Sequence, residues 1–131
     1  MAGRNSVLVV TPSPNDYDLI VSSLAPEEVE ILPAHCLLEA VLQQVASPDH
    51  PYVVVYDTDS PEEWRQALRR FLTVRPQTRV VLVSRLADDQ MWMDVLDNGG
   101  FDLIMKPFQP VEIRTVVRGA ITGRVNTVAA A

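Results

Sequence analysis

The sequence predicts a doubly wound α/β fold, in which helices cover both faces of a parallel sheet of five strands. Short apolar runs without charge, such as 7–10, 53–56 and 80–83, are typical of strands buried on both faces. These runs alternate along the chain with segments of helical periodicity. The connections between them are only a few residues long, so each strand, helix and next strand should form a right-handed crossover.

The first strand, 7–10, leads into a helix. Ser13 has the N-cap position and Pro14 the first helical position, where its missing N–H is tolerated. The helix carries apolar residues at the spacing i, i+3, i+4 and i+7, namely Tyr17, Ile20, Val21 and Leu24. One face of this helix is therefore predicted to pack against the sheet.

The second strand, 29–32, contains a charge, Glu30, and is expected to stop at Pro33. A charge within so short a strand favours an edge position in the sheet. The next helix is predicted to end before Ser47-Pro48. We expect it to face the core through Leu38, Val41, Leu42 and Val45.

The third strand, 52–56, ends on a carboxylate, Asp57. The following residues predict a helix start, with Ser60 as N-cap, Pro61 at the first helical position and Glu63 completing a capping box. Asp57 should therefore lie in a strand-to-helix loop at the carboxyl edge of the sheet, where open α/β sheets bind ligands. The helix is expected to bury Trp64, Ala67, Leu68 and Phe71 and to end at Arg75-Pro76.

The fourth strand, 80–83, delivers Ser84 to the same edge. A helix that Asp88 and Asp89 introduce follows it, and Gly99-Gly100 ends that helix. The last strand, 101–105, precedes a final helix with Ile113, Val116, Val117 and Ala120 at core spacing. The expected strand order is 2-1-3-4-5, the flavodoxin-like arrangement.

Composition limits the class of protein. At 131 residues and 47% hydrophobic, the chain is long enough for one domain with its own core. A net charge of −6 and scattered Lys and Arg argue against direct nucleic-acid binding. A membrane helix and a signal peptide are not predicted, so we expect a cytoplasmic protein. Cys36 is interpreted as a small core residue, and His35 and His50 lack metal-ligand spacing.

Three motifs together resemble a known family. They are Asp57 with Pro61 four residues later, Ser84 after the fourth strand, and Lys106-Pro107-Phe108 after the fifth. In this order they are similar to the CheY-like receiver domain of two-component response regulators. The resemblance covers 6–121 and leaves 1–5 and 122–131 as terminal tails.

The resemblance implies a phosphoprotein that works by phosphorelay signal transduction and not as an enzyme. The carboxylate at the Asp57 position would take a phosphoryl group from a phosphohistidine, and Ser84 and Lys106 would contact its oxygens. Such contacts neutralise charge on the transferred group. Mg²⁺ would be held by Asp57 and by the backbone carbonyl of Asp59. Implied partners are a histidine kinase or phosphotransfer protein, a downstream signalling protein and a second copy in a homodimer.

The chain departs from this family at the first strand, where Thr11 and Pro12 replace the acidic residues that hold the metal. Mg²⁺ is usually bound through carboxylates, and it loses its waters reluctantly, so Asp57 alone should bind it weakly. The side chain of Asp16 or Asp59 acting through water is the alternative. Mg²⁺-dependent phosphorylation is therefore expected to be impaired, which makes this an atypical receiver.

A second departure concerns switching. Leu103 stands where the family usually has Tyr or Phe, and Arg85 follows Ser84 where a small residue is usual. Trp92 and Met93 lie on the fourth helix, which belongs to the usual partner face of receivers. Both residues are therefore candidates for that face, although core packing is the ordinary role of such side chains.

Three functions remain open from the sequence. We favour a degenerate receiver that signals through protein–protein interaction. The alternative is a functional receiver that a histidine kinase phosphorylates on Asp57. The third, a small flavodoxin-like cofactor protein, is disfavoured because Pro12 and Pro14 remove backbone N–H donors that a phosphate needs after the first strand.

Overall fold

The computed structural model describes residues 6–46 and 52–123. Its strands are β1 (Ser6–Val10), β2 (Glu30–Ala34), β3 (Tyr52–Asp57), β4 (Arg79–Ser84) and β5 (Asp102–Met105). Its helices are α1 (Pro14–Leu24), α2 (Leu37–Ala46), α3 (Pro61–Val74), α4 (Asp89–Asp97) and α5 (Pro110–Thr122), with a 3₁₀ turn η1 at Ala25–Glu27. His50 lies outside the described residues.

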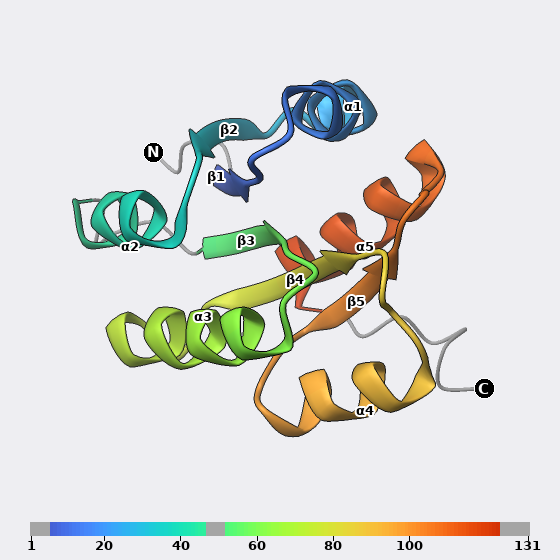
Figure 1. Cartoon of the computed structure of the whole chain (residues 1–131). Coiled ribbons are helices and arrows are strands. Elements are labelled where there is room, and N and C mark those ends of the chain that lie inside the picture. The colour runs from blue at the N-terminus through green and yellow to red at the C-terminus, as the bar shows by residue number, and fades with distance from the viewer. Residues whose placement is uncertain (1–5, 47–51, 124–131) are drawn as a thin grey trace.

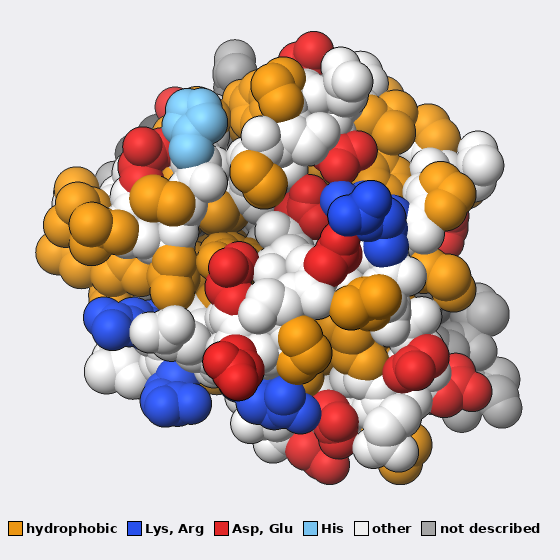
Figure 2. All heavy atoms as spheres, in the orientation of Figure 1, with side chains coloured by type: hydrophobic (Ala, Val, Ile, Leu, Met, Phe, Trp, Pro, Cys, Tyr) orange, Lys and Arg blue, Asp and Glu red, His pale blue; other side chains and the backbone are white. Residues whose placement is uncertain are grey.

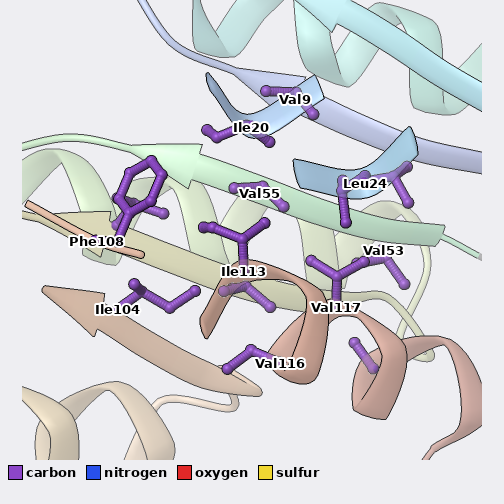
Figure 3. Packing of buried hydrophobic residues seen from close by; sticks show 14 residues of the cluster. Val9, Ile20, Leu24, Val53, Val55, Ile104, Phe108, Ile113, Val116 and Val117 are labelled. Carbon is purple, nitrogen blue, oxygen red and sulfur yellow. The ribbon is translucent and has the colours of Figure 1, made fainter. Parts of the chain in front are cut away.

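The strands form one parallel sheet in the order β2-β1-β3-β4-β5 (Figure 1), which confirms the predicted flavodoxin-like fold. Successive side chains of a strand point to opposite faces of the sheet. Val7 and Val9 of β1 therefore join a core with α1 and α5, whereas Leu8 and Val10 join a core with α2, α3 and α4. Figure 3 shows the first of these cores, with Ile20 of α1 and Ile113 of α5 converging on the sheet.

The second strand is longer than predicted. β2 continues through Pro33, which pairs with Val9 of β1. An edge strand tolerates proline because one side of it has no neighbouring strand to receive an N–H. The last strand is shorter than predicted, since Phe101 precedes β5.

The predicted inner face of α2 is wrong for three of its four residues, whereas the fourth, Val41, does pack against the core. Leu38, Leu42 and Val45 are 68%, 59% and 56% exposed, while Ala40 and Gln44 are completely buried. In Figure 2 hydrophobic side chains gather at the left of the molecule, where Figure 1 places α2. The Gln44 amide donates from Nε2 to Thr78 Oγ1 at 2.7 Å and to the Phe71 carbonyl at 3.3 Å, whereas its buried Oε1 has no hydrogen-bond partner within the described residues. A buried polar residue therefore joins α2 to α3.

This arrangement predicts that two substitutions on α2 change the free energy of unfolding by very different amounts. Gln44→Ala should lower the free energy of unfolding by about 2 kcal/mol, because it leaves a cavity and removes the bond to Thr78. Leu42→Ala should change it by less than about 0.5 kcal/mol because its side chain is exposed. Urea unfolding of both variants checks this, and a larger loss for Leu42→Ala would contradict the observed helix orientation.

No helix within residues 6–46 and 52–123 has both the length and the apolar character that a membrane crossing requires.

Candidate functional site

The three residues that carried the family resemblance lie at the carboxyl edge of the sheet. Asp57 is the last residue of β3, Ser84 is the last residue of β4, and Lys106 follows β5 directly. Parallel strands end at the same edge, so residues far apart in the sequence meet there. Asp57, Lys106 and Asp16 line one cleft, and Arg85 lines it as well. Figure 2 shows acidic side chains next to a basic group near the middle of this view.

Asp57 is 7% exposed and has two hydrogen-bonding neighbours. The Thr11 hydroxyl donates to Asp57 Oδ2 at 2.7 Å. Lys106 Nζ lies 2.7 Å from Oδ1 and 2.9 Å from Oδ2 of the same carboxylate. Thr11 Oγ1 also accepts from the backbone N–H of Ser13 at 3.1 Å, which fixes its orientation. Thr11 is thus an uncharged hydrogen-bond donor to Asp57 at the carboxyl end of β1.

Lys106 joins two carboxylates. Besides Asp57, its ammonium donates to Asp16 Oδ2 at 3.0 Å. Burial by itself would lower the pKa of Lys106, but hydrogen bonds and charge attraction from Asp57 and Asp16 outweigh it, and the pKa is raised. The Lys106-Pro107 peptide bond is cis. Because its pKa is raised, the lysine stays charged, and its bond to Asp16 holds α1 next to the end of β3.

Ser84 does not contact Asp57 but contacts Asp59. Its hydroxyl donates to Asp59 Oδ1 at 3.1 Å, and Arg85 donates to the same oxygen from its backbone N–H at 3.0 Å. The Arg85 guanidinium donates to Asp59 Oδ2 from Nε at 2.9 Å and from Nη2 at 2.6 Å. Asp59 follows the third strand and Arg85 follows the fourth, and the sequence analysis did not connect them. In the structure they form one cluster.

Comparison with known proteins places the fold. No protein-family model matches the chain. The chain is 26% identical over 123 residues to regulatory protein AtoC of Escherichia coli K12, a match that covers 92% of this chain and 26% of that protein. A response regulator receiver domain from Clostridium thermocellum has a TM-score of 0.80 at 19% identity, covering 91% of this chain and 95% of that one. This chain has the fold of a response-regulator receiver domain.

A second solved structure supports the same receiver fold. It is the CheX–CheY–BeF₃–Mg²⁺ complex of Borrelia burgdorferi, with a TM-score of 0.79 at 22% identity. The match covers 89% of each chain. The resemblance to receiver domains inferred from the three motifs is thereby confirmed at the level of the fold.

The donor set of this receiver fold does not suit Mg²⁺. The ion prefers carboxylates and water, whereas here Lys106 bridges Asp57 and Asp16, and Thr11 presents a hydrogen to Asp57. The Asp59 side chain turns toward Arg85. Among the described residues, no three His, Cys, Asp or Glu side chains form a group that could hold a metal ion. Asp16 does reach the site, as the sequence alternative allowed, but it binds the lysine.

The residues proposed for switching and partner contact lie on α4 and β5. Leu103 is half-buried and packs against the core that α2, α3 and α4 share with the sheet. Trp92 is half-buried, and its indole N–H donates to Asp102 Oδ1 at 3.0 Å, which ties α4 to β5. Met93 is 56% exposed. The surface of α4 thus offers Met93, while Trp92 mainly anchors the helix.

Cys36 and Tyr56 also line the cleft. Cys36 is exposed and lines the cleft, so its interpretation as a core residue is wrong. Tyr56 is buried and donates from its hydroxyl to Glu63 Oε1 at 3.1 Å. Burial, with the Glu63 charge, raises the pKa of Tyr56, so its phenol stays protonated.

The Asp59 cluster predicts a measurable titration. Hydrogen bonds from the backbone and side chain of Arg85 lower the pKa of Asp59 from its ordinary value of 3.8. The contribution of this carboxylate to stability is therefore complete above pH 3.8 and is lost as the pH falls through the lower, folded pKa. Carboxyl ¹³C NMR should find the midpoint below 3.8, and Arg85→Ala should move it upward. Equal midpoints in the two proteins would contradict the cluster.

Proposed function

We propose that residues 6–121 form an atypical receiver module of a two-component or phosphorelay pathway, which acts in the cytoplasm through protein–protein interaction. Its output is binding and not turnover. Mg²⁺-dependent phosphorylation of Asp57 is impaired in this proposal. The observation that carries it is the contact from Thr11 to Asp57, because a neutral donor stands where a metal-binding carboxylate is needed.

The surroundings of Asp57 support this proposal. Thr11 and Lys106 already donate to both carboxylate oxygens, and the ammonium neutralises the charge of Asp57 without a metal ion. A magnesium ion bound here would have to displace the ammonium from Asp57 or bind beside its positive charge. Either route is unfavourable at a carboxylate that is 7% exposed.

Two of the similar proteins support a proposal about partners. The receiver fold from Borrelia burgdorferi was solved in complex with CheX, and AtoC is a regulatory protein of which this chain spans about a quarter, 26%. We therefore propose a histidine kinase or phosphotransfer protein upstream and a signalling protein downstream, with α4, β5 and α5 as the contact face. Exposed Met93 is the candidate contact residue on α4. A homodimer through this face is the other partner that we propose.

A backbone amide NMR titration tests the proposal. Mg²⁺ is added first and beryllofluoride second, since the Borrelia burgdorferi complex contains both, and Asp57→Ala is the control. We expect neither addition to shift the amides of Asp57, Ser84 or Lys106 at millimolar metal.

Shifts at these residues that spread to Leu103 and α4, and that are absent from Asp57→Ala, would overturn the proposal. They would establish a phospho-switch and so favour the alternative, a functional receiver phosphorylated on Asp57 by a histidine kinase. Its supporting observation is that Asp57, Asp16 and Lys106 do meet in one cleft.

A further inference from the structure

The end of β4 presents three hydrogen-bond donors to one side chain. They are the Ser84 hydroxyl, the Arg85 backbone N–H and the Arg85 guanidinium, and all of them reach Asp59. We propose that Asp59 is a built-in anionic ligand of these donors, which occupies them in place of a phosphoryl group. The loop from β4 to α4 is thereby held in one conformation without phosphorylation. This inference rests on the proposed function, because it explains how an impaired site keeps a defined state.

The Ser84 hydroxyl is already occupied by Asp59. A serine hydroxyl has one hydrogen to donate, and Ser84 uses it on Asp59 Oδ1. Its oxygen meanwhile accepts from the backbone N–H of Leu86 at 3.0 Å. Ser84 is completely buried, so it depends on these partners for its hydrogen bonds. An oxygen bound to Asp57 could receive the Ser84 hydrogen only after Asp59 had left it.

The three donors to Asp59 differ in how strongly they hold its carboxylate. The Arg85 side chain is 73% exposed, and the Asp59 side chain is 31% exposed. An exposed ion pair contributes little because solvent screens it and two side chains lose freedom. The other two donors differ, since the Ser84 hydroxyl is buried and the Arg85 N–H belongs to the backbone at the strand end. The carboxylate is therefore positioned mainly by β4, and the guanidinium adds a charge-assisted bond. The lowered pKa of Asp59 agrees with this arrangement.

A short loop connects the Asp59 cluster to α4. The loop runs from Arg85 to Asp88, and Asp88 caps α4 by accepting from the backbone N–H of Met91 at 2.8 Å. At the other end of the loop, Ser84 holds Leu86 through its oxygen and holds the N–H of Lys106 through its carbonyl, at 3.0 Å. Both ends of this short loop are therefore fixed. Within residues 6–46 and 52–123, the hydrogen bonds that join it to the loop that follows β3 all run to Asp59, so they hold it in place relative to Asp57.

The test uses metal-free protein and inorganic phosphate. In wild-type protein, millimolar phosphate should leave the amide signals of Arg85 and Leu86 unchanged, because their donors are occupied. In Asp59→Ala, both signals should move before any addition, and phosphate should then shift them saturably. Asp18→Ala, which removes an exposed acid of α1, is the matched control for net charge and should behave as wild type.

A double variant distinguishes phosphate binding by these specific donors from a general effect of the lost negative charge. Asp59→Ala combined with Arg85→Ala should bind phosphate at least about tenfold more weakly than Asp59→Ala alone, because it lacks the charge-assisted donor. The inference is overturned if Asp59→Ala leaves the Arg85 and Leu86 signals in place. It is also overturned if phosphate shifts the wild type as strongly as the variant, or if the double variant binds equally well. These samples contain no metal, so their outcome is separate from that of the Mg²⁺ titration, which tests the proposed function.

Discussion

Replacing Lys106 with methionine will lower the free energy of unfolding by about 3 kcal/mol at neutral pH, the lower end for a broken buried ion pair, because the pair borders an open cleft. The substitution keeps most of the side-chain volume, so cavity formation contributes little. It leaves the Asp57 carboxylate, whose side chain is 5% exposed, without its cation. It also leaves Asp16 facing a second negative charge. Urea unfolding of the variant measures the loss.

A double-mutant cycle shows whether the loss comes from the charge. Asp57→Asn should restore most of the stability in the Lys106→Met background, because a neutral amide no longer needs the ammonium. The raised pKa of Lys106 sets the pH range, since stability from the pair is complete below its ordinary value of 10.5 and is lost as the pH rises through the folded pKa. A loss in Lys106→Met that Asp57→Asn does not relieve would show that packing, and not charge, is responsible.

Replacing Thr11 with aspartate should create a Mg²⁺ site. Thr11 is 4% exposed, and its hydroxyl points at Asp57 Oδ2, so an aspartate there would place a second carboxylate next to the first. Without metal, the two like charges should destabilise the protein by about 2 kcal/mol. Mg²⁺ at about 100 times its Kd should then add about 2.7 kcal/mol. Thermal unfolding with Mg²⁺ and with a chelator measures both effects.

Thr11→Asn is the matched control, because it has nearly the same shape as the aspartate and no charge. It should show no stabilisation by Mg²⁺, as should the wild type. If the wild type gains as much from Mg²⁺ as Thr11→Asp does, then Thr11 is not the reason for weak metal binding and the proposed impairment is wrong.

The sequence predicts the fold well because its strands are short and nearly uniform. Runs such as Val53 to Tyr56 permit only a strand buried on both faces, and their order along the chain fixes the crossovers. The sequence also predicts that three polar residues share one edge of the sheet. Asp57 and Ser84 are the last residues of their strands and Lys106 directly follows one, and the carboxyl ends of parallel strands share one edge.

The inner face of α2 could not be predicted because the helix is apolar almost all round. Its sequence, LLEAVLQQVA, has one charged residue, and both possible stripes have helical spacing. The stripe that packs inward contains Gln44. Its amide N–H group donates to the Phe71 carbonyl in α3 and to Thr78 in the loop that follows α3. Those partners are distant in sequence, so periodicity alone favours the more hydrophobic stripe, which is the exposed one.

The pairing of Asp59 with Arg85 was missed for a related reason. Twenty-six positions separate the two residues, and neither belongs to a periodic pattern. Their contact depends on side-chain rotamers at the ends of β3 and β4. The register between these strands, in which Asp57 lies opposite Val83, brings the two following loops together. Predicted register would have made the pair a candidate, whereas spacing along the chain could not.

The proline in β2 has a consequence for how this molecule meets other proteins. An open sheet has two outer strands, and an exposed outer strand can act as a template on which a foreign chain forms a further strand. β2 has only five residues, one of which is Pro33 without an N–H, and it carries the charge of Glu30. β5, at the opposite edge, has only four residues. Both borders are poor templates for β-augmentation, which protects against edge-to-edge aggregation.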